Sequence, residues 1–296
     1  MLHGVEWLGR QYTALSKGPA DNQSLIQTIT TFATRLAQAS QTENPFQERR
    51  AAILSLKGLA KDHAKEVGEH AGKQLLDCLV QVVSITPPKA ANDDVARSLV
   101  ESLLAICTPP KNPSQPAQFA GLKRPPPPSK GSPSLDLFLG SPQPMHALLP
   151  LLSTRHTFYL RFSALQLLSL LLRHRKTMVQ SHVLTSPGGC RAILDCLSTN
   201  SSTGQFLGSS AEIVRNETLL LLPHLVDSNA DIQKLVAFEG AFEKLLDVIA
   251  REGRIEGGVV VQDALEALEA LLRYNVSNQV SAPTSFRESS RGSQHS

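Results

Sequence analysis

The most regular feature of the chain is an apolar triplet at positions i, i+3 and i+6 that returns five times along the sequence. This spacing places three side chains on one face of an α-helix. The triplets start 47, 65, 54 and 46 residues apart, and intervals of about 40–47 residues are typical of HEAT and armadillo repeats. The pattern therefore predicts stacked helical units. The five triplets are Ile53-Leu56-Leu59, Val100-Leu103-Ile106, Leu165-Leu168-Leu171, Leu219-Leu222-Leu225 and Leu265-Leu268-Leu271.

The two long intervals each contain a segment that has no helical pattern. Residues 108–133 are rich in Pro, Ser, Lys and Gln, and residues 198–210 are rich in Ser, Thr and Gly. Such compositions favour loops over packed helices. We expect a disordered Pro-rich inserted loop at 108–133 and a Ser/Gly-rich loop at 198–210, both inserted into an otherwise regular repeat.

The better-marked units follow one order of elements: a short helix, a glycine turn, a longer helix and the triplet helix. Glycine suits that turn because it adopts left-handed backbone angles without a Cβ clash. Three helices per unit is the armadillo plan, whereas HEAT units have two. The sequence thus predicts an all-α, armadillo-like, right-handed α-solenoid of about five repeats over residues 21–275. A flexible N-terminal arm (1–20) precedes it and a disordered tail (276–296) follows.

Individual helices can be placed from apolar stripes and stop signals. We expect helices at Asp21–Ser40, Gln47–Lys61 and Glu69–Ser84, and a further helix capped by Asn92-Asp93. Farther along, the pattern predicts separate helices at Phe158–Leu172 and Met178–Leu184. An arginine also stands four residues before three of the triplets, at Arg49, Arg161 and Arg215. We expect these arginines to stabilise the interface between units.

Composition and charge narrow the class of protein. Hydrophobic residues make up 41% of the chain but aromatic residues only 5%, and the strong helix formers Leu and Ala fill most apolar positions. The 29 basic and 26 acidic side chains give a net charge of +3, so no global field favours nucleic acid. The start of the chain lacks the charged region and apolar core of a secretory signal. A cytoplasmic protein that binds no nucleic acid is predicted.

Candidate catalytic and metal-binding groups are few. Gly188-Gly189 and Gly257-Gly258 lack the flanking residues of phosphate-binding loops, and His174 and His182 form a pair eight residues apart without an HExxH motif. The four cysteines, Cys78, Cys107, Cys190 and Cys196, lie in apolar helical contexts without a CxxC motif. We expect buried small side chains there, with metal ligation or disulfides as the alternative. The sequence predicts no enzyme, no cofactor, no metal and no catalytic residues.

The sequence contains one short candidate binding motif and lacks another. Pro125–Lys130 has the PxxPxK form of ligands for Src-homology-3-type domains, but short Pro-rich matches arise easily in loops, so a stiff, soluble spacer between repeats is the preferred interpretation. An importin α-like peptide groove needs a ladder of Trp and Asn on successive third helices, and the only tryptophan, Trp7, lies outside every repeat. This argues against nuclear-signal binding. The ladder positions hold Leu54/Gly58, Glu101/Ala105, Gln166/Leu170, Leu220/His224 and Glu266/Ala270.

Several segments resemble one protein family. The matching strings are Val214-Arg-Asn-Glu-Thr-Leu-Leu-Leu-Leu, Asp231-Ile-Gln-Lys-Leu-Val-Ala-Phe-Glu-Gly and Glu256-Gly-Gly-Val-Val-Val-Gln-Asp-Ala-Leu. They are similar to the armadillo head of the general vesicular transport factor family, golgin-type tethers of traffic between endoplasmic reticulum and Golgi. Weaker matches bring the resemblance to about residues 25–279. It implies a peripheral protein on the cytoplasmic face of Golgi membranes and ER-derived vesicles, with Rab-family GTPases, golgins and the SNARE machinery as partners.

The chain departs from the family pattern at its C-terminal end. Family members continue into further repeats, a dimerising coiled coil and an acidic tail, whereas residues 280–296 show neither a repeat nor heptads. We expect a truncated solenoid whose fifth unit has an uncovered apolar face, so that dimerisation is not implied. The predicted function is a non-catalytic vesicle-tethering and protein-interaction module. A generic armadillo adaptor unrelated to tethering is the alternative, and neither reading assigns contact residues.

Overall fold

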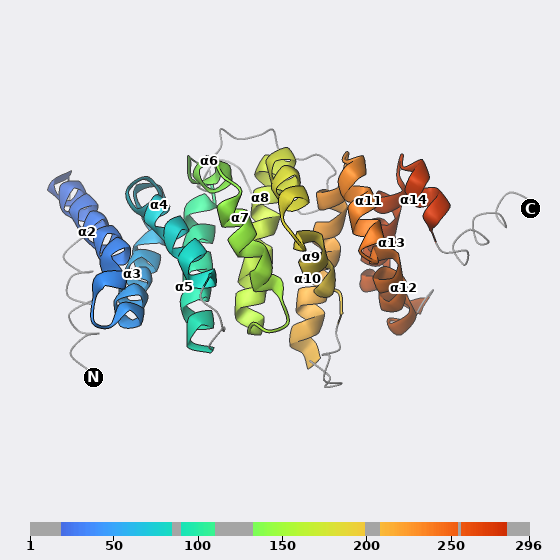
Figure 1. Ribbon diagram of the computed structural model, residues 1–296, viewed down its shortest axis with the longest axis horizontal. Coiled ribbons are helices and arrows are strands. Elements are labelled where there is room, and N and C mark those ends of the chain that lie inside the picture. Colours follow the sequence, from blue (N-terminus) through green and yellow to red (C-terminus); the bar gives the residue numbers. More distant parts are fainter. Residues whose placement is uncertain (1–18, 85–89, 110–132, 199–207, 254–255, 283–296) are drawn as a thin grey trace, which may run out of the picture.

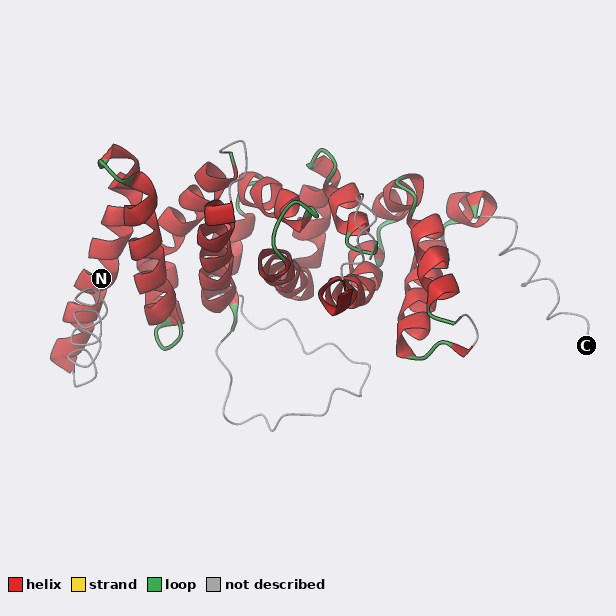
Figure 2. Cartoon of the chain, turned by 90° about the horizontal axis from the view of Figure 1, so that it is seen from below, coloured by secondary structure: helices red, strands yellow, loops and turns green. Residues whose placement is uncertain are grey.

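The structure, a computed structural model, describes residues 19–84, 90–109, 133–198, 208–253 and 256–282. These residues form helices that stand side by side in one row, from α2 at the N-terminal end to α14 at the C-terminal end (Figure 1). Viewed along the perpendicular direction, the described part contains helices and connecting loops without a strand (Figure 2). The architecture is an all-α, armadillo-like solenoid, as the triplet pattern predicted.

The N-terminal half is built mainly from helix pairs. The helices α2 (Pro19–Gln38) and α3 (Pro45–Ala60), separated by the short 3-10 helix η1 (Ala39–Gln41), form the first pair. The second pair consists of α4 (Ala64–Val83) and α5 (Ala90–Cys107). A third unit follows residues 110–132 with the short helices α6 (Pro133–Leu139), α7 (Gln143–Leu148) and η2 (Leu149–Leu152).

The C-terminal half follows the three-helix plan. The long helix α8 (Phe158–Thr185) completes the third unit and begins the fourth, which continues with α9 (Gly189–Asp195) and α10 (Gly208–Val226). The fifth unit comprises α11 (Ala230–Phe238), α12 (Ala241–Arg251) and α13 (Val259–Leu272). Left-handed glycines, Gly188 at φ 68° and Gly240 at φ 87°, make the turns before α9 and α12. The predicted glycine turns are therefore present in both units.

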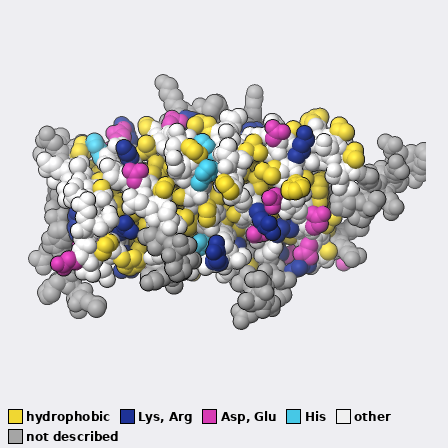
Figure 3. Space-filling view, viewed as in Figure 1, with side chains coloured by type: hydrophobic (Ala, Val, Ile, Leu, Met, Phe, Trp, Pro, Cys, Tyr) yellow, Lys and Arg dark blue, Asp and Glu magenta, His cyan; other side chains and the backbone are white. Residues whose placement is uncertain are grey.

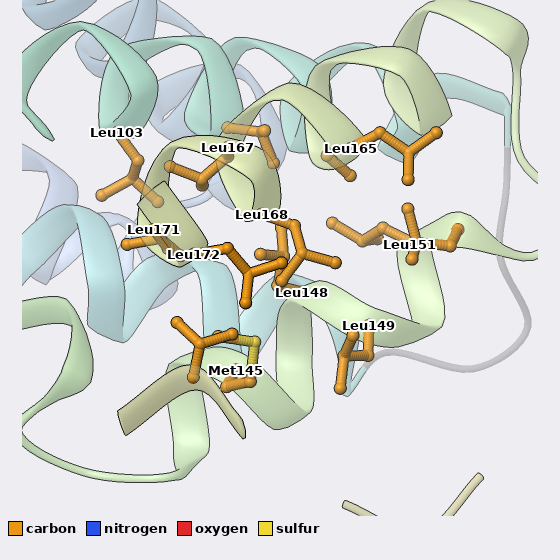
Figure 4. Packing of buried hydrophobic residues seen from close by; sticks show 14 of the residues in the cluster. Leu103, Met145, Leu148, Leu149, Leu151, Leu165, Leu167, Leu168, Leu171 and Leu172 are labelled. Carbon is orange, nitrogen blue, oxygen red and sulfur yellow. The ribbon is translucent and has the colours of Figure 1, made fainter. Parts of the chain in front are cut away.

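The third helices form a continuous stack. In order, α3, α5, α8, α10 and α13 each pack on the next, and their triplet side chains are buried with one exception, Leu265. A single core of buried apolar side chains extends from Leu25 to Ala282. Figure 4 shows part of this core, where Leu148 of the third unit lies beside Leu168 and Leu172 of α8. Stacking of the predicted leucine ridges thus produces the fold.

One helix prediction is confirmed and one is corrected by the structure. The two helices expected at Phe158–Leu172 and Met178–Leu184 are the two segments of α8, which are separated by a kink at the non-helical backbone of Arg175 (φ −141°, ψ 50°). The correction concerns the tail predicted from residue 276, because Val276–Ser281 forms helix α14. The pattern missed α14 because its buried side chain is the polar Asn278, held by hydrogen bonds in place of an apolar stripe.

The other predicted irregular segments lie largely outside the described residues. These are most of the N-terminal arm (1–20), the 108–133 loop, the 198–210 loop and the end of the tail. Their predicted disorder stays a prediction. Where helices border them, the bounds differ by two or three residues from those expected, since α2 already begins at Pro19 and α10 at Gly208.

Candidate protein-interaction surface

The predicted thiols lie in the apolar interior. All four cysteines are free and buried, and burial raises the pKa of Cys78 to about 11 and those of Cys107 and Cys190 to about 12. Burial also raises the pKa of Cys196, against the opposing influence of Arg161. These thiols are therefore protonated and weakly nucleophilic near neutral pH. Within the described ranges, no group of three or more His, Cys, Asp or Glu side chains is arranged to hold a metal ion.

The histidine pair named from the sequence has separate surroundings. His182 Nε2 lies 2.9 Å from the Leu139 carbonyl oxygen, which ties the second half of α8 to the end of α6. Burial lowers the pKa of His174, and the neighbouring charges of Arg173 and Arg175 lower it further. The contact of His182 therefore has a structural role, and the charges that act on His174 are those of its two arginine neighbours.

Two of the three predicted interface arginines are buried and hydrogen-bonded. Arg161 Nε donates to the Leu152 carbonyl oxygen at 2.9 Å, and its Nη2 lies 3.7 Å from Cys196 Sγ. Arg215 Nη1 donates to Glu252 Oε1 at 2.6 Å. Each arginine joins its triplet helix to an earlier or later segment of the stack. Arg49 is half-buried and reaches Gln81 Oε1 at 3.4 Å.

An aspartate at the start of α5 has a different role from the one predicted. Asp93 lies within α5, which begins at Ala90, and does not cap that helix. One carboxylate oxygen accepts from the Thr157 backbone N–H at 2.8 Å, and the other lies 2.8 Å from His156 Nδ1. Asp93 therefore fixes the start of α8, whose first N–H groups would otherwise lack partners. Sequence spacing could not show this contact between residues more than sixty positions apart.

A buried glutamine in the first helix of the fourth unit joins three helices. Gln180 Nε2 donates to the carbonyl oxygens of Leu225 and Asp227, both at 2.9 Å, at the end of α10. Gln180 Oε1 accepts from Asn229 Nδ2 at 3.4 Å. We call this arrangement a glutamine clasp. It gives partners to helix-end carbonyls that have none within their own helix.

The fifth unit repeats the clasp. Gln233 Nε2 donates to the Ala270 oxygen at 2.8 Å and to the Arg273 oxygen at 3.1 Å, while its Oε1 accepts from Asn275 Nδ2 at 3.0 Å. Asn229 and Asn275 also cap the next helices, accepting from Ile232 N and Asn278 N. Each cap stands four residues after the last leucine of a triplet, a spacing that sequence reasoning overlooked.

The third helices also present apolar side chains to solvent. Leu54, Tyr159, Ile213 and Leu220 are exposed on α3, α8 and α10. We call these four residues, together with Arg97, the third-helix surface. Leu54 and Leu220 occupy positions of the ladder considered above, where an importin α-like groove would carry Trp. Exposed leucines there favour an apolar protein contact over recognition of a basic peptide.

Charges and an aromatic ring accompany these leucines. The Arg97 guanidinium lies 5.6 Å from the centre of the Tyr159 ring, and Arg97 also pairs with Asp94 at 3.3 Å. Lys57 pairs with Glu101 across α3 and α5. Figure 3 shows apolar and charged side chains of both signs interspersed over one face of the molecule. Aromatic and arginine side chains are enriched where proteins bind other proteins.

Among the described residues, no helix is both long and apolar enough to cross a membrane. The third-helix surface is a candidate binding site because it combines exposed apolar side chains with Arg97 and Tyr159. This surface offers apolar side chains, a cation–π pair and charged side chains that are paired with one another, all of which suit binding to another macromolecule.

Comparison with known proteins identifies relatives, although no protein-family model matches the chain. The human general vesicular transport factor p115 is 32% identical over 264 residues, which cover 89% of this chain and 24% of p115. The fission yeast intracellular protein transport protein uso1 is 30% identical over 271 residues, covering 92% of this chain and 22% of uso1. Golgin candidate 6 of Arabidopsis thaliana is 33% identical over 247 residues, or 83% and 24% of the two chains.

Solved structures agree with the fold. A crystal structure of Uso1-2 superposes with a TM-score of 0.69 at 24% identity, covering 90% of this chain and 38% of that one. A crystal structure of Uso1-1 gives a TM-score of 0.66 at 25% identity, covering 86% and 37%. The chain spans about a quarter of the length of the curated relatives it matches. The family resemblance seen in the sequence is confirmed: the chain is a homologue of the p115 and Uso1 vesicular transport factors.

Proposed function

We propose that this chain is a non-catalytic protein-interaction module that takes part in vesicle tethering between the endoplasmic reticulum and the Golgi and within the Golgi. The observation that carries the proposal is the sequence identity of 30–32% with vesicular transport factors, which extends over 89–92% of this chain. The third-helix surface supports it, because Leu54, Tyr159 and Leu220 offer apolar contacts on an ordered support. A preformed surface binds with little ordering cost.

The proposed partners are proteins of the tethering machinery: a Rab-family GTPase, golgins and the SNARE machinery. The proposed location is the cytoplasm, with peripheral association at Golgi membranes and ER-derived vesicles. A protein partner suits the surface because cationic, aromatic and aliphatic side chains lie within one row of helices. Arg97 and Tyr159 lie side by side, and both residue types are enriched among the residues that contribute most to protein binding.

Retention of purified Rab GTPases on the immobilised chain tests this proposal. Golgi and endoplasmic reticulum Rab proteins would be loaded with a non-hydrolysable GTP analogue or with GDP. We expect retention of at least one Rab protein in the GTP-like state, with roughly tenfold weaker binding of the Leu220→Asp and Tyr159→Ala variants. Both side chains are exposed, so the substitutions spare the core.

A matched control distinguishes binding at this surface from nonspecific hydrophobic binding. Phe238 is the last residue of α11, the first helix of the fifth unit. Its side chain is 87% exposed but lies outside the third-helix surface. The Phe238→Asp variant should bind as the unaltered chain does. Retention that does not depend on the bound nucleotide, or that decreases equally in all three variants, would contradict the proposal and favour a generic armadillo adaptor.

A further inference from the structure

Aromatic side chains gather at the start of α8, around Tyr159 of the third-helix surface. Aromatic residues make up only 5% of the chain, yet Phe158, Tyr159 and Phe162 lie within five consecutive positions. The ring centres of Phe158 and Tyr159 are 5.1 Å apart, and those of Phe158 and Phe162 are 5.7 Å apart. Tyr159 is 62% exposed, and the two phenylalanines are half-buried. We call these three residues the aromatic patch.

The register of the repeat places apolar residues of α10 beside this patch. The triplets of α8 and α10 start 54 residues apart, and the buried positions of the two helices follow the same register. Tyr159 therefore corresponds to Ile213, and both are exposed. Because α8 and α10 pack directly against each other, these two residues stand at the same level on neighbouring helices. Leu220, also exposed, stands two turns farther along α10. The exposed apolar area thus continues from α8 onto α10.

Two carboxylates of α10 border this apolar area. Glu212 precedes Ile213 and is exposed, and Glu217 follows five residues later and is half-buried. In the same register, Glu217 stands one position after the equivalent of Phe162. Neither carboxylate has an ion-pair partner among the described residues. In contrast, the charged side chains of α3 and α5 on the same surface are paired with one another. The α10 side of the surface therefore favours a cationic partner.

The chain itself shows how a cation binds to this patch. The guanidinium carbon of Arg97 lies 5.6 Å from the centre of the Tyr159 ring, and the same guanidinium pairs with two carboxylates of its own helix. A planar guanidinium can stack on an aromatic ring and form two parallel hydrogen bonds with a carboxylate. On the α10 side of the patch, the Phe162 ring and the Glu217 carboxylate offer the same two kinds of partner. Within the described part of the chain, neither group has a cation–π contact or an ion pair.

A second copy of the chain fits this place poorly. Three exposed arginines have no ion-pair partner in the described ranges, Arg155, Arg173 and Arg191. The residues immediately beside them are polar, small or buried, so none of the three presents an exposed apolar side chain next to its guanidinium. Arg50 has exposed apolar neighbours on α3, but it already pairs with Asp94 at 3.8 Å. A segment of another protein is therefore favoured over a second copy.

We propose that the aromatic patch and the adjoining face of α10 bind an arginine side chain of a partner protein, together with an apolar side chain that lies beside it. The guanidinium stacks on Phe162 and pairs with Glu217, in the way that Arg97 stacks on Tyr159. The apolar side chain contacts Ile213. The inference rests on the proposed role as a protein-interaction module, and it specifies the chemistry of the partner at the third-helix surface.

Peptides that differ in one side chain test this chemistry. The probe is the fluorescein-labelled peptide Gly-Ser-Leu-Arg-Ser-Leu-Gly, and in three related peptides Lys, citrulline or Glu replaces the Arg. Titration with the full chain, followed by fluorescence anisotropy, should show roughly fivefold weaker binding of the Lys peptide, because an ammonium group lacks the planar stacking surface. Binding of the citrulline peptide, which keeps the shape but loses the charge, should be roughly tenfold weaker. Equal affinity of the Arg and citrulline peptides, tightest binding of the Glu peptide, or no binding of the Arg peptide up to about 1 mM would overturn the proposal.

Variants of the chain locate the binding site. Glu217→Gln should weaken binding of the Arg peptide roughly fivefold and leave the citrulline peptide unchanged, because only a charged guanidinium pairs with the carboxylate. Phe162→Leu, which keeps an apolar side chain, should weaken binding of the Arg peptide roughly threefold. Glu66→Gln in α4 is the matched control, because Glu66 is also half-buried without an ion-pair partner in the described part of the chain. Circular dichroism verifies that each variant is folded. An equal loss in Glu66→Gln, or the same loss for both peptides in Glu217→Gln, would refute the assignment.

Two further readouts separate the alternatives. Sedimentation velocity of the full chain should show no dimer that depends on Glu217, and a dimer abolished by Glu217→Gln would assign the site to a second copy. Peptide titration requires neither a Rab protein nor a membrane. If all four peptides bind equally while Rab retention depends on the bound nucleotide, only the inference about arginine fails. If the Arg peptide is preferred while Rab retention does not depend on the nucleotide, only the tethering proposal fails.

Discussion

The N-terminal and C-terminal halves of the solenoid hold successive units together in different ways. The helices α2 and α4 have 20 residues each, and they pack directly through apolar side chains. In the fifth unit, α11 has nine residues and α12 has 11. There, glutamine clasps, asparagine caps and the buried Arg215 connect the helices.

The comparison suggests a physical rule for this molecule. A long helix buries a long apolar stripe, and burial scales with area without demanding one orientation. A short helix offers less area, so directional hydrogen bonds must fix where it begins and ends. The C-terminal units should therefore depend on single polar side chains, and the N-terminal units on close packing.

Removal of a glutamine clasp should have the largest effect. Gln233→Ala takes the donor from two helix-end carbonyls and removes the nearer of the two acceptors of Asn275 Nδ2. We expect a loss of about 3 kcal/mol in the free energy of unfolding, measured by urea denaturation. Gln262→Ala is the control, because Gln262 is exposed on α13. If Gln233→Ala loses no more free energy of unfolding than Gln262→Ala does, the fifth unit does not depend on the clasp.

Overpacking should be the corresponding weakness of the N-terminal half. A Cβ at Gly68 of α4 would lie 2.3 Å from Ser134 Oγ and 3.6 Å from Ile106 Cβ. Gly68→Val should lower the free energy of unfolding by about 2 kcal/mol, because α5 and α6 cannot both move away from α4. Gly58 of α3 has open space at its Cβ, so Gly58→Val should cost clearly less. Equal losses in the two valine variants would show that close packing at α4 does not matter.

Alanine substitution of glycines should change sign between the two halves. Gly240 has φ 87°, so Gly240→Ala should destabilise the fold by about 1 kcal/mol. Gly58 lies inside α3 with helical geometry, and Gly58→Ala should stabilise it by about 1 kcal/mol. Thermal unfolding followed by circular dichroism gives both values. The same sign for both variants would contradict the assignment of Gly240 to the turn.

The ion pair between α3 and α5 should contribute least. Lys57 and Glu101 are each about 30% exposed at the side chain, so we expect about 0.5 kcal/mol, reduced further by salt. A double-mutant cycle of Lys57→Gln and Glu101→Gln measures the coupling between them. A coupling energy larger than the loss in free energy of unfolding caused by Gln233→Ala would contradict the proposed order. In that order, packing and not charge stabilises the N-terminal units.

Many helix positions could be predicted because they depend on local spacing. The triplets, the glycine turns at Gly188 and Gly240 and the buried arginines were all readable from the sequence. Asp93 was misassigned because its partners, His156 and Thr157, are more than sixty residues away. Helix α14 was missed because hydrogen bonds to Gln233 and Leu271, rather than an apolar stripe, stabilise Asn278.

The sequence by itself determined that the chain is helical, that its units repeat and that it resembles the vesicular transport factors. These properties follow from residue order over one or two helical turns and from long matching strings. Only the tertiary structure decided that Arg97 lies over the Tyr159 ring and that Asp93 holds the start of α8. The partners in these contacts stand on different helices, and the physical reason is that stacking of the helices, not spacing along the chain, brings them together.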